Sequence, residues 1–220
     1  MSRFDLVIFD FDGVVADSEL LNNQAMAEVL TGIGLPTTLD EALSHYMGRR
    51  WLDCVPEIEA RLGRRCPDTT LDDWTRLCHA RAATSLTAVP GAAAFMAELA
   101  LPRCIASSSP PAWIELGLNT LGIAPAHAGP IYSGAVHVTR GKPHPDLFLH
   151  AACELGVRPD RTLVIEDSPA GVQAGAAAGM TVIGLLAGGH IRDGHGERLS
   201  TAGADHLLPD YAAVEAFINA

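Results

Sequence analysis

The sequence contains little that would indicate a membrane protein or a nucleic-acid-binding protein. No apolar run approaches the roughly 20 residues needed to span a bilayer. Asp5 and Asp10 interrupt the apolar N-terminus, so we expect no signal peptide. The formal net charge of −11 argues against a nucleic-acid partner and against an anionic membrane surface. We therefore expect a cytoplasmic location.

Cysteines and aromatic residues are also scarce. The five cysteines are an odd number and show no Cys-x-x-Cys spacing, which argues against a disulfide framework and a zinc site. Aromatic residues make up 5% of the chain, whereas apolar residues make up 48%. A chain of 220 residues can bury a full hydrophobic core. We expect a closely packed aliphatic core, with Cys104 as a small buried residue within an apolar run.

Short apolar runs alternate with helical patterns in most of the chain. The predicted strands are residues 6–9, 101–106, 131–132, 162–165, 181–185 and 206–208. Helices are predicted from Pro110, over 145–155 and 169–178, and after Asp210 as a capping residue. This alternation predicts an α/β fold with a Rossmann-like parallel sheet and right-handed crossovers.

A long helical block interrupts the alternation directly after the first strand. Residues 18–86 have helical patterns, with a capping box at Thr38 and Glu41 and a further helix start near Thr70. Pro56 is expected to break or kink the helix over residues 51–62. The block is too long for a crossover. We therefore predict a small α-helical domain at residues 17–86, a candidate lid, inserted into an α/β core of residues 1–16 and 87–220.

The most informative motif is Asp10-Phe11-Asp12-Gly13, which follows the first apolar run. Residues 6–9 have the composition of a strand buried on both faces, and parallel sheets place their chemistry beyond the carboxyl ends of such strands. Two carboxylates so close repel each other unless a cation shares them or one holds a proton. The motif therefore suggests a metal-assisted site, although a strand-terminating turn also favours Asp and Gly.

Three further polar motifs lie at strand or loop ends. Ser107 and Ser108 follow the second predicted strand, and Lys142 lies in a proline-rich loop just before a helix. Glu166 and Asp167 directly follow the strand at residues 162–165. Taken singly, these motifs have ordinary explanations as a helix cap, a surface lysine and acidic residues at a helix N-terminus.

Taken together and in this order, the motifs resemble those of the haloacid dehalogenase superfamily of phosphohydrolases. The resemblance covers essentially the whole chain, because the helical block is similar to the α-helical cap of the β-phosphoglucomutase and phosphoglycolate-phosphatase branch. It implies an α/β core with an inserted cap and the hydrolysis of a phosphate monoester. A dehalogenase is less expected, since that branch lacks the equivalents of Asp12 and of the Glu166-Asp167 pair.

The resemblance also implies a role for each motif. Asp10 is expected to be the nucleophile that forms an aspartyl-phosphate, and Asp12 the general acid and base. Ser107 is expected to donate its hydroxyl to the phosphoryl group, together with backbone N–H groups near Ser108. Lys142 is expected to neutralise that group and the Asp10 carboxylate.

Oxygen ligands and a phosphoryl substrate favour Mg²⁺ as the cofactor. The resemblance implies that the Asp10 carboxylate, the Asp12 backbone carbonyl and the Asp167 carboxylate hold the ion. It implies that Glu166 acts on the ion indirectly, either by supporting a ligand or through a bound water.

Residues of the helical block bear on the substrate. Arg49 and Arg50 lie in the segment that resembles the family's specificity loop, where they either grip a second anionic group or are exposed arginines at a helix start. Asn22 stands where the mutase carries a histidine, and Pro110 and Pro111 where it carries a Lys-Asn pair. We therefore expect a phosphatase that acts on small sugar phosphates or sugar-acid phosphates, as a monomer or weak homodimer.

Two alternative functions remain open. A β-phosphoglucomutase-like phosphomutase is the first, and a non-catalytic binding protein on the same fold is less favoured. His190, Asp193 and His195 are candidate ligands of a second metal site. Their glycine-rich surroundings instead favour a flexible, solvated surface loop.

Overall fold

The computed structural model describes residues 3–220, which form a parallel sheet of six strands in the order β3-β2-β1-β4-β5-β6. The strands are β1 (Leu6–Phe9), β2 (Arg103–Ser107), β3 (Ile131–Ser133), β4 (Thr162–Glu166), β5 (Thr181–Leu185) and β6 (His206–Leu208). Because β1 lies between β2 and β4, the residues that follow these three strands meet at one edge of the sheet.

The six predicted strands and the α/β class are confirmed. Strands β5 and β6 have the predicted bounds, and β4 continues one residue further, to Glu166. Strand β2 begins at Arg103 instead of residue 101, since Pro102 has no N–H to donate to a neighbouring strand.

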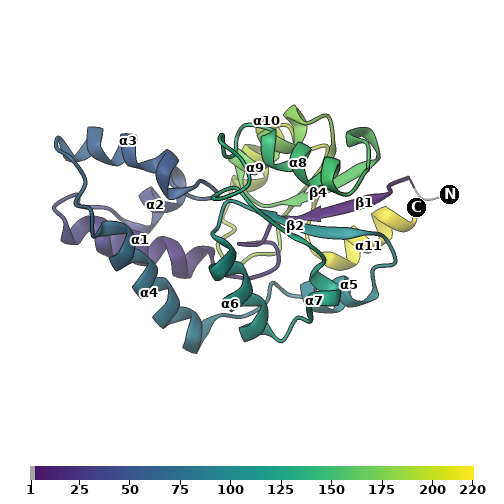
Figure 1. Cartoon of the computed structure of the whole chain (residues 1–220), viewed down its shortest axis with the longest axis horizontal. Helices are drawn as coiled ribbons and strands as arrows, with labels where there is room; N and C mark the ends of the chain where they lie inside the picture. Colours follow the sequence, from purple (N-terminus) through teal and green to yellow (C-terminus); the bar gives the residue numbers. More distant parts are fainter. Residues whose placement is uncertain (1–2) are drawn as a thin grey trace.

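Helices cover both faces of the sheet (Figure 1). One face carries α5 (Ala92–Glu98), α6 (Pro111–Leu121), α7 (Pro125–Ala128) and α11 (Tyr211–Asn219), and the other carries α8 (Asp146–Glu154), α9 (Pro169–Ala177) and α10 (His195–Ala202). A short 3₁₀ helix (Pro159–Arg161) precedes β4. Successive side chains of a strand point to opposite faces. Accordingly, Val7 and Phe9 belong to one core cluster and Leu6 and Ile8 to the other.

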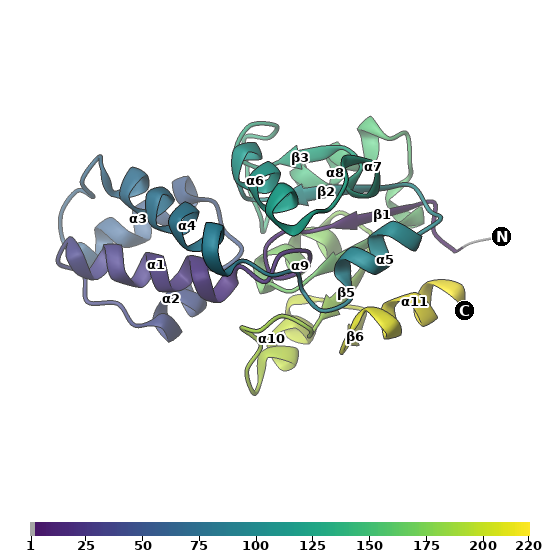
Figure 2. The same cartoon turned by 90° about the horizontal axis from the view of Figure 1, so that it is seen from below.

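Four helices form a separate body at one end of the molecule, far from both termini (Figures 1 and 2). They are α1 (Glu19–Gly32), α2 (Leu39–His45), α3 (Trp51–Leu62) and α4 (Thr70–Ser85), and we call them the insert. The insert has its own small core, which includes Leu30, Tyr46 and Ile58. None of the helices in residues 3–220 has the length and apolar character needed to cross a membrane.

The chain enters and leaves the insert at one place. The Asp17 N–H donates to the Thr87 carbonyl at 2.9 Å, and Ala16 forms an antiparallel bridge with Ala88. The two connecting segments therefore lie side by side between the insert and the sheet.

Local sequence signals predicted most helix ends. The capping box of Thr38 and Glu41, the start of α4 at Thr70 and the Asp210 cap of α11 are confirmed. Of the break or kink predicted at Pro56, the break is wrong, because α3 runs through it from Trp51 to Leu62, and the kink stays a prediction. A proline removes one backbone hydrogen bond, which a helix packed against its neighbours can tolerate.

Candidate active site

Buried acidic and basic side chains meet at the edge of the sheet where β1, β2 and β4 end. Asp10 follows β1, Ser107 ends β2, and Glu166 and Asp167 follow one another at the end of β4. Together with Lys142, all of them are at most 3% exposed. The sheet topology thus brings together residues that lie up to 157 positions apart.

Lys142 lies between two carboxylates. Its Nζ donates to Asp10 Oδ1 at 2.7 Å and to Glu166 Oε1 at 2.6 Å. Burial disfavours the ammonium, but the two carboxylates overcome this and raise the pKa of Lys142 above its usual value. Lys142, the only lysine in the chain, is therefore a fixed positive charge beside Asp10.

The Asp10 carboxylate lies in an environment with an excess of negative charge. Burial raises the pKa of Asp10 well above its usual value; Lys142 opposes this shift, whereas Glu166 and Asp167 add to it. A single ammonium does not balance these buried acids. An additional cation would favour the ionised form of Asp10.

Asp167 provides the clearest sign of where such a cation would bind. Ligand oxygens of Asp10, Glu166 and Asp167 lie within 4.8 Å of one another. Both Asp167 carboxylate oxygens are buried and accept no hydrogen bond from the described residues. Burial and the nearby Glu166 raise the pKa of Asp167 well above its usual value. Hard, oxygen-only donors with unsatisfied charge fit a divalent cation such as Mg²⁺.

Glu166 differs from Asp167 because its oxygens are already bonded. Oε1 accepts from Lys142, and Oε2 accepts from the backbone N–H groups of Asp167 and Ser168 and from the Ser168 hydroxyl, each at 3.0 Å. Glu166 is therefore positioned to hold Lys142, which is compatible with an indirect role at a cation site.

Two glycines allow the acidic residues to approach the backbone this closely. A β-carbon at Gly13, whose φ is 77°, would overlap the Asp167 carboxylate. A β-carbon at Gly171 would overlap the Glu166 carboxylate. The glycines of both motifs are therefore required by the packing of the acids.

Asp12 is held by four donors from both parts of the molecule. Its Oδ1 accepts from Ser18 Oγ at 2.5 Å, Asn22 Nδ2 at 3.1 Å and Trp113 Nε1 at 2.8 Å. Its Oδ2 accepts from Ser109 Oγ at 2.6 Å. Asn22, predicted to bind substrate, thus contacts Asp12, and the sequence did not single out Ser109 or Trp113 for this site.

A small pocket of about 50 Å³ lies between the sheet edge and the insert. Asp10, Asp12 and Ser107 line it from the core. The Ser107 Oγ accepts the Ser109 N–H at 3.1 Å, and the Ser108 Oγ donates to the Gly48 carbonyl of the insert at 2.9 Å. The predicted serines therefore border the pocket beside Asp10.

Glu19 is a further acid of this pocket that sequence reasoning missed. It is the first residue of α1 and is 4% exposed, with its Oε2 accepting from Asn23 Nδ2 at 2.6 Å. Burial raises the pKa of Glu19 well above its usual value, and the nearby Asp167, Asp12 and Asp10 act in the same direction. Acidic residues are common in the first turn of a helix, so the position of Glu19 alone does not indicate a place in the pocket.

The glycine-rich segment before α10 corrects a second prediction. His190 and His195 are 2% and 1% exposed, so the expected solvated surface loop is wrong for both. His195 Nε2 lies 2.6 Å from the Asp167 carbonyl oxygen. His190 Nε2 lies 2.9 Å from Asp167 Oδ2 without the orientation of a hydrogen bond, and burial lowers the pKa of His190 to about 4. The two imidazoles therefore pack against Asp167, His190 beside its carboxylate and His195 against its backbone carbonyl.

Arg49 and Arg50 have different partners. Arg49 donates to Glu57 at 2.7 Å and to carbonyls of the insert. Arg50 pairs with Asp53 and donates to three carbonyl oxygens of the core, those of Gly134, Val138 and Thr139, at 2.9 to 3.2 Å. Arg50 therefore joins the insert to the core, and a role of either guanidinium in binding a second anion stays a prediction.

Comparison with known proteins finds one family model and several similar proteins that match this chain. The family model of the haloacid dehalogenase-like hydrolases matches residues 4–179. The 6-phosphogluconate phosphatase of Escherichia coli is 28% identical over 191 residues, which cover 86% of each chain. Hexitol phosphatase A of the same organism is 32% identical over 185 residues, 82% of each chain.

A solved structure of a hydrolase is also similar to this chain. The crystal structure of a hydrolase of this family from Deinococcus radiodurans, with bound phosphate and sodium, is 35% identical to this chain with a TM-score of 0.75. The alignment covers 99% of this chain and 96% of that one.

Proposed function

Because the chain belongs to the haloacid dehalogenase-like hydrolase family, we propose that it is a phosphatase that hydrolyses a small phosphorylated metabolite through an aspartyl-phosphate on Asp10. The observation that carries the proposal is the Lys142–Asp10 contact of 2.7 Å beside the unbonded Asp167 carboxylate. A buried nucleophile, a fixed ammonium beside it and carboxylate oxygens that accept no hydrogen bond suit attack on an anionic ester.

The residues around the pocket would bind and orient the phosphoryl group. Lys142 supplies positive charge, and the Ser107 hydroxyl and the Ser108 backbone N–H supply hydrogen-bond donors at the end of β2. Lys142 holds the Asp10 carboxylate by Oδ1, which leaves Oδ2 to attack the phosphorus. The P–O bond to the leaving alcohol breaks as the Asp10–phosphorus bond forms.

Asp12 would move the protons. It donates a proton to the departing oxygen in the first step, which releases the alcohol. In the second step it takes a proton from the water that attacks the aspartyl-phosphate, which frees inorganic phosphate and restores Asp10. Ser18, Asn22 and Ser109 hold the Asp12 carboxylate in place.

Mg²⁺ would be held by the carboxylates of Asp10 and Asp167 and by the backbone carbonyl of Asp12. Glu166 would act on the ion indirectly. When bound, the ion neutralises negative charge on the carboxylates and on the phosphoryl group. The free Asp167 oxygens and the excess of buried acid support this assignment.

The substrate class we propose is sugar phosphates and sugar-acid phosphates. Two similar proteins are named for 6-phosphogluconate and hexitol phosphates, and both are phosphatases, which favours hydrolysis over a mutase reaction. The bound phosphate in the Deinococcus structure also supports recognition of a phosphoryl group. A cytoplasmic location, a monomer or weak homodimer and the lack of a nucleic-acid partner are predictions from the sequence.

The test is a screen of phosphorylated sugars, sugar acids and polyols with Mg²⁺ and with a chelator. We expect phosphate release that depends on Mg²⁺ and falls by a factor on the order of 10⁴ or more in Asp10→Asn. Circular dichroism of Asp10→Asn serves as the folding control. Near-normal turnover by a folded Asp10→Asn protein would rule out the proposed mechanism.

A further inference from the structure

A second, larger cavity of about 330 Å³ opens between the insert and the core. Its large apolar lining residues are Trp51, Leu52, Leu71 and Trp74 from the insert and Pro110 and Trp113 from the core. We call this cavity the tryptophan groove. The chain has only three tryptophans, and all three line it.

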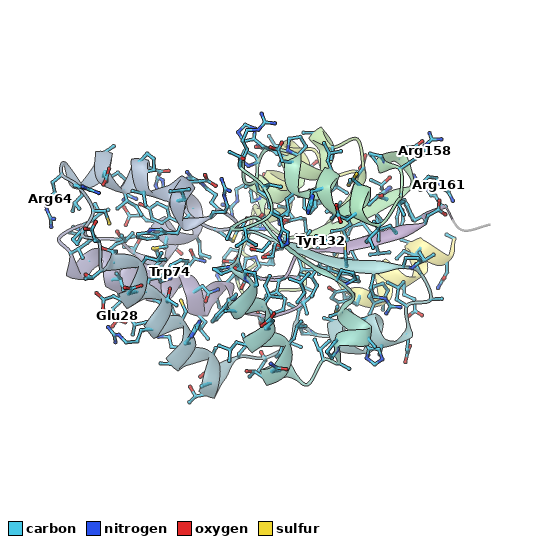
Figure 3. The ribbon with its side chains drawn as sticks, viewed as in Figure 1. Glu28, Arg64, Trp74, Tyr132, Arg158 and Arg161 are labelled. Atoms are coloured by element: carbon cyan, nitrogen blue, oxygen red, sulfur yellow. The ribbon has the colours of Figure 1, made fainter. Side chains whose placement is uncertain are left out.

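The indole N–H groups of Trp74 and Trp113 are already bonded within the protein, so these two rings offer their carbon faces to a ligand. Trp74 Nε1 donates to the Asn22 carbonyl at 3.0 Å, and Trp113 Nε1 donates to Asp12 Oδ1 at 2.8 Å. Trp74 stacks on Trp51 with ring centroids 5.9 Å apart, and Trp113 stacks on His79 at 5.7 Å. Figure 3 shows Trp74 on the insert, at the opposite end from Arg158 and Arg161. The aromatic walls are thus held in fixed orientations.

Exposed leucines extend the apolar surface of the groove. Leu52 is 71% exposed and Leu71 is 39% exposed, and both are among the few large apolar side chains of the described residues that are this accessible. Apolar side chains gathered at an open cavity indicate a binding surface. A ligand that covers these leucines removes their apolar surface from water, which favours binding.

Neither arginine that lines the groove is free to pair with an anionic ligand. The two guanidinium groups at its edge are already paired, Arg49 with Glu57 and Arg50 with Asp53. A second phosphate or carboxylate placed there would compete with these pairs. The lining therefore favours an uncharged ligand.

The tryptophan groove adjoins the catalytic pocket. Both cavities are lined by Asn22, Arg49, Trp51, Trp74, Ser108 and Ser109. The pocket of about 50 Å³ at Asp10 has room for little beyond a phosphoryl group, so the rest of a substrate must extend outwards.

We propose that the tryptophan groove binds the distal part of the leaving group, and that this part is uncharged and aromatic or aliphatic. The substrate class is then a phosphate monoester of an alcohol, such as a sugar or polyol, that carries an apolar group at its far end. This inference rests on the proposed phosphatase function and narrows its substrate.

Two esters with similar primary-alcohol leaving groups test the proposal, namely ethyl phosphate and 2-phenylethyl phosphate, each assayed with Mg²⁺. We expect kcat/KM to be at least about tenfold higher for 2-phenylethyl phosphate, mainly through a lower KM, since even one methylene in an apolar subsite changes specificity by this factor. In Leu71→Asp, which places a carboxylate in the groove, we expect the ratio of the two kcat/KM values to fall towards one.

Leu149→Asp is the matched control, because Leu149 is 38% exposed on α8 and does not line the groove. We expect it to keep the wild-type ratio. Leu52→Asp repeats the test if Leu71→Asp does not fold. Equal kcat/KM values for the two esters in the wild type would overturn the subsite and leave the phosphatase function intact. Hydrolysis of neither ester, nor of any compound in the metabolite screen, would overturn the phosphatase function and the subsite with it.

Discussion

On the core side of the site, Lys142 and Glu166 are almost fully buried and bonded to each other, whereas on the insert side Leu52 and Leu71 are apolar and exposed. Each of these two core side chains has more than one hydrogen-bond partner. The insert contributes aromatic and aliphatic surface, with Glu19 as its buried acid.

The contacts that join the two parts also differ from those within the core. The Ser108–Gly48 bond and the three carbonyl contacts of Arg50 connect the insert loop to the core. A core site of buried charged groups and an insert with exposed apolar surface suggest different roles for the two parts. The core would carry the chemistry, and the insert would select the substrate.

Lys142→Met is expected to have the largest effect, because it removes the positive charge of the core. It leaves the Asp10 and Glu166 carboxylates buried without their partner, which costs about 3 kcal/mol of unfolding free energy. We also expect kcat to fall by a factor on the order of 10² to 10³. Urea unfolding and steady-state kinetics measure the two effects.

Arg140→Met is the matched control for Lys142→Met. Arg140 lies two residues away and pairs with Asp146 at 2.7 Å, but its side chain is 59% exposed. Its loss should change stability by less than about 1 kcal/mol. Equal losses in the two variants would contradict the contrast between buried and exposed charge.

Arg50→Met tests the attachment of the insert. Arg50 is 8% exposed, and its loss frees three core carbonyls, so we expect about 2 kcal/mol less stability. We also expect faster amide hydrogen exchange over residues 134–139 and a higher KM. Arg64→Met is the control, because Arg64 donates to the Ile33 carbonyl within the insert. Unchanged exchange over residues 134–139 in Arg50→Met would show that Arg50 does not hold the insert.

Glu19→Gln tests the one buried acid of the insert and has the smallest expected effect. Burial raises the pKa of Glu19 above its usual value of 4.5, so the folded state holds its proton to a higher pH than the unfolded state. Stability from this group is complete below pH 4.5 and decreases as pH rises through the folded-state pKa. The loss is at most about 1.4 kcal/mol per pH unit.

Glutamine does not titrate, so Glu19→Gln should gain stability relative to the wild type as pH rises. Urea unfolding of the metal-free proteins between pH 4 and pH 8 measures this difference. Glu28→Gln, on the same helix with a side chain that is 59% exposed, is the control. A difference between Glu19→Gln and the wild type that is independent of pH would contradict a raised pKa.

The strand ends of the core could be predicted because local patterns define them. Asp10, Ser107 and Asp167 follow apolar runs, and a parallel sheet places such residues at one edge. Lys142 lies in a loop, and only the comparison of its motif with a family's pattern indicated that it would reach Asp10.

The remaining features depend on packing between distant segments. The glycines around His190 are typical of a solvated loop, and only the approach of Asp167 to this segment explains why its imidazole is buried. Arg50 likewise meets carbonyls more than 80 residues away, which no local spacing reveals. The insert side of the site was therefore less predictable than the core side.

Because the tryptophans of this chain all line one groove, its intrinsic fluorescence is a native optical reporter of that surface. Emission wavelength and quenching would follow solvent access between the two bodies of the molecule without any label. A titration with a colourless ligand would then reveal occupancy even when nothing is hydrolysed.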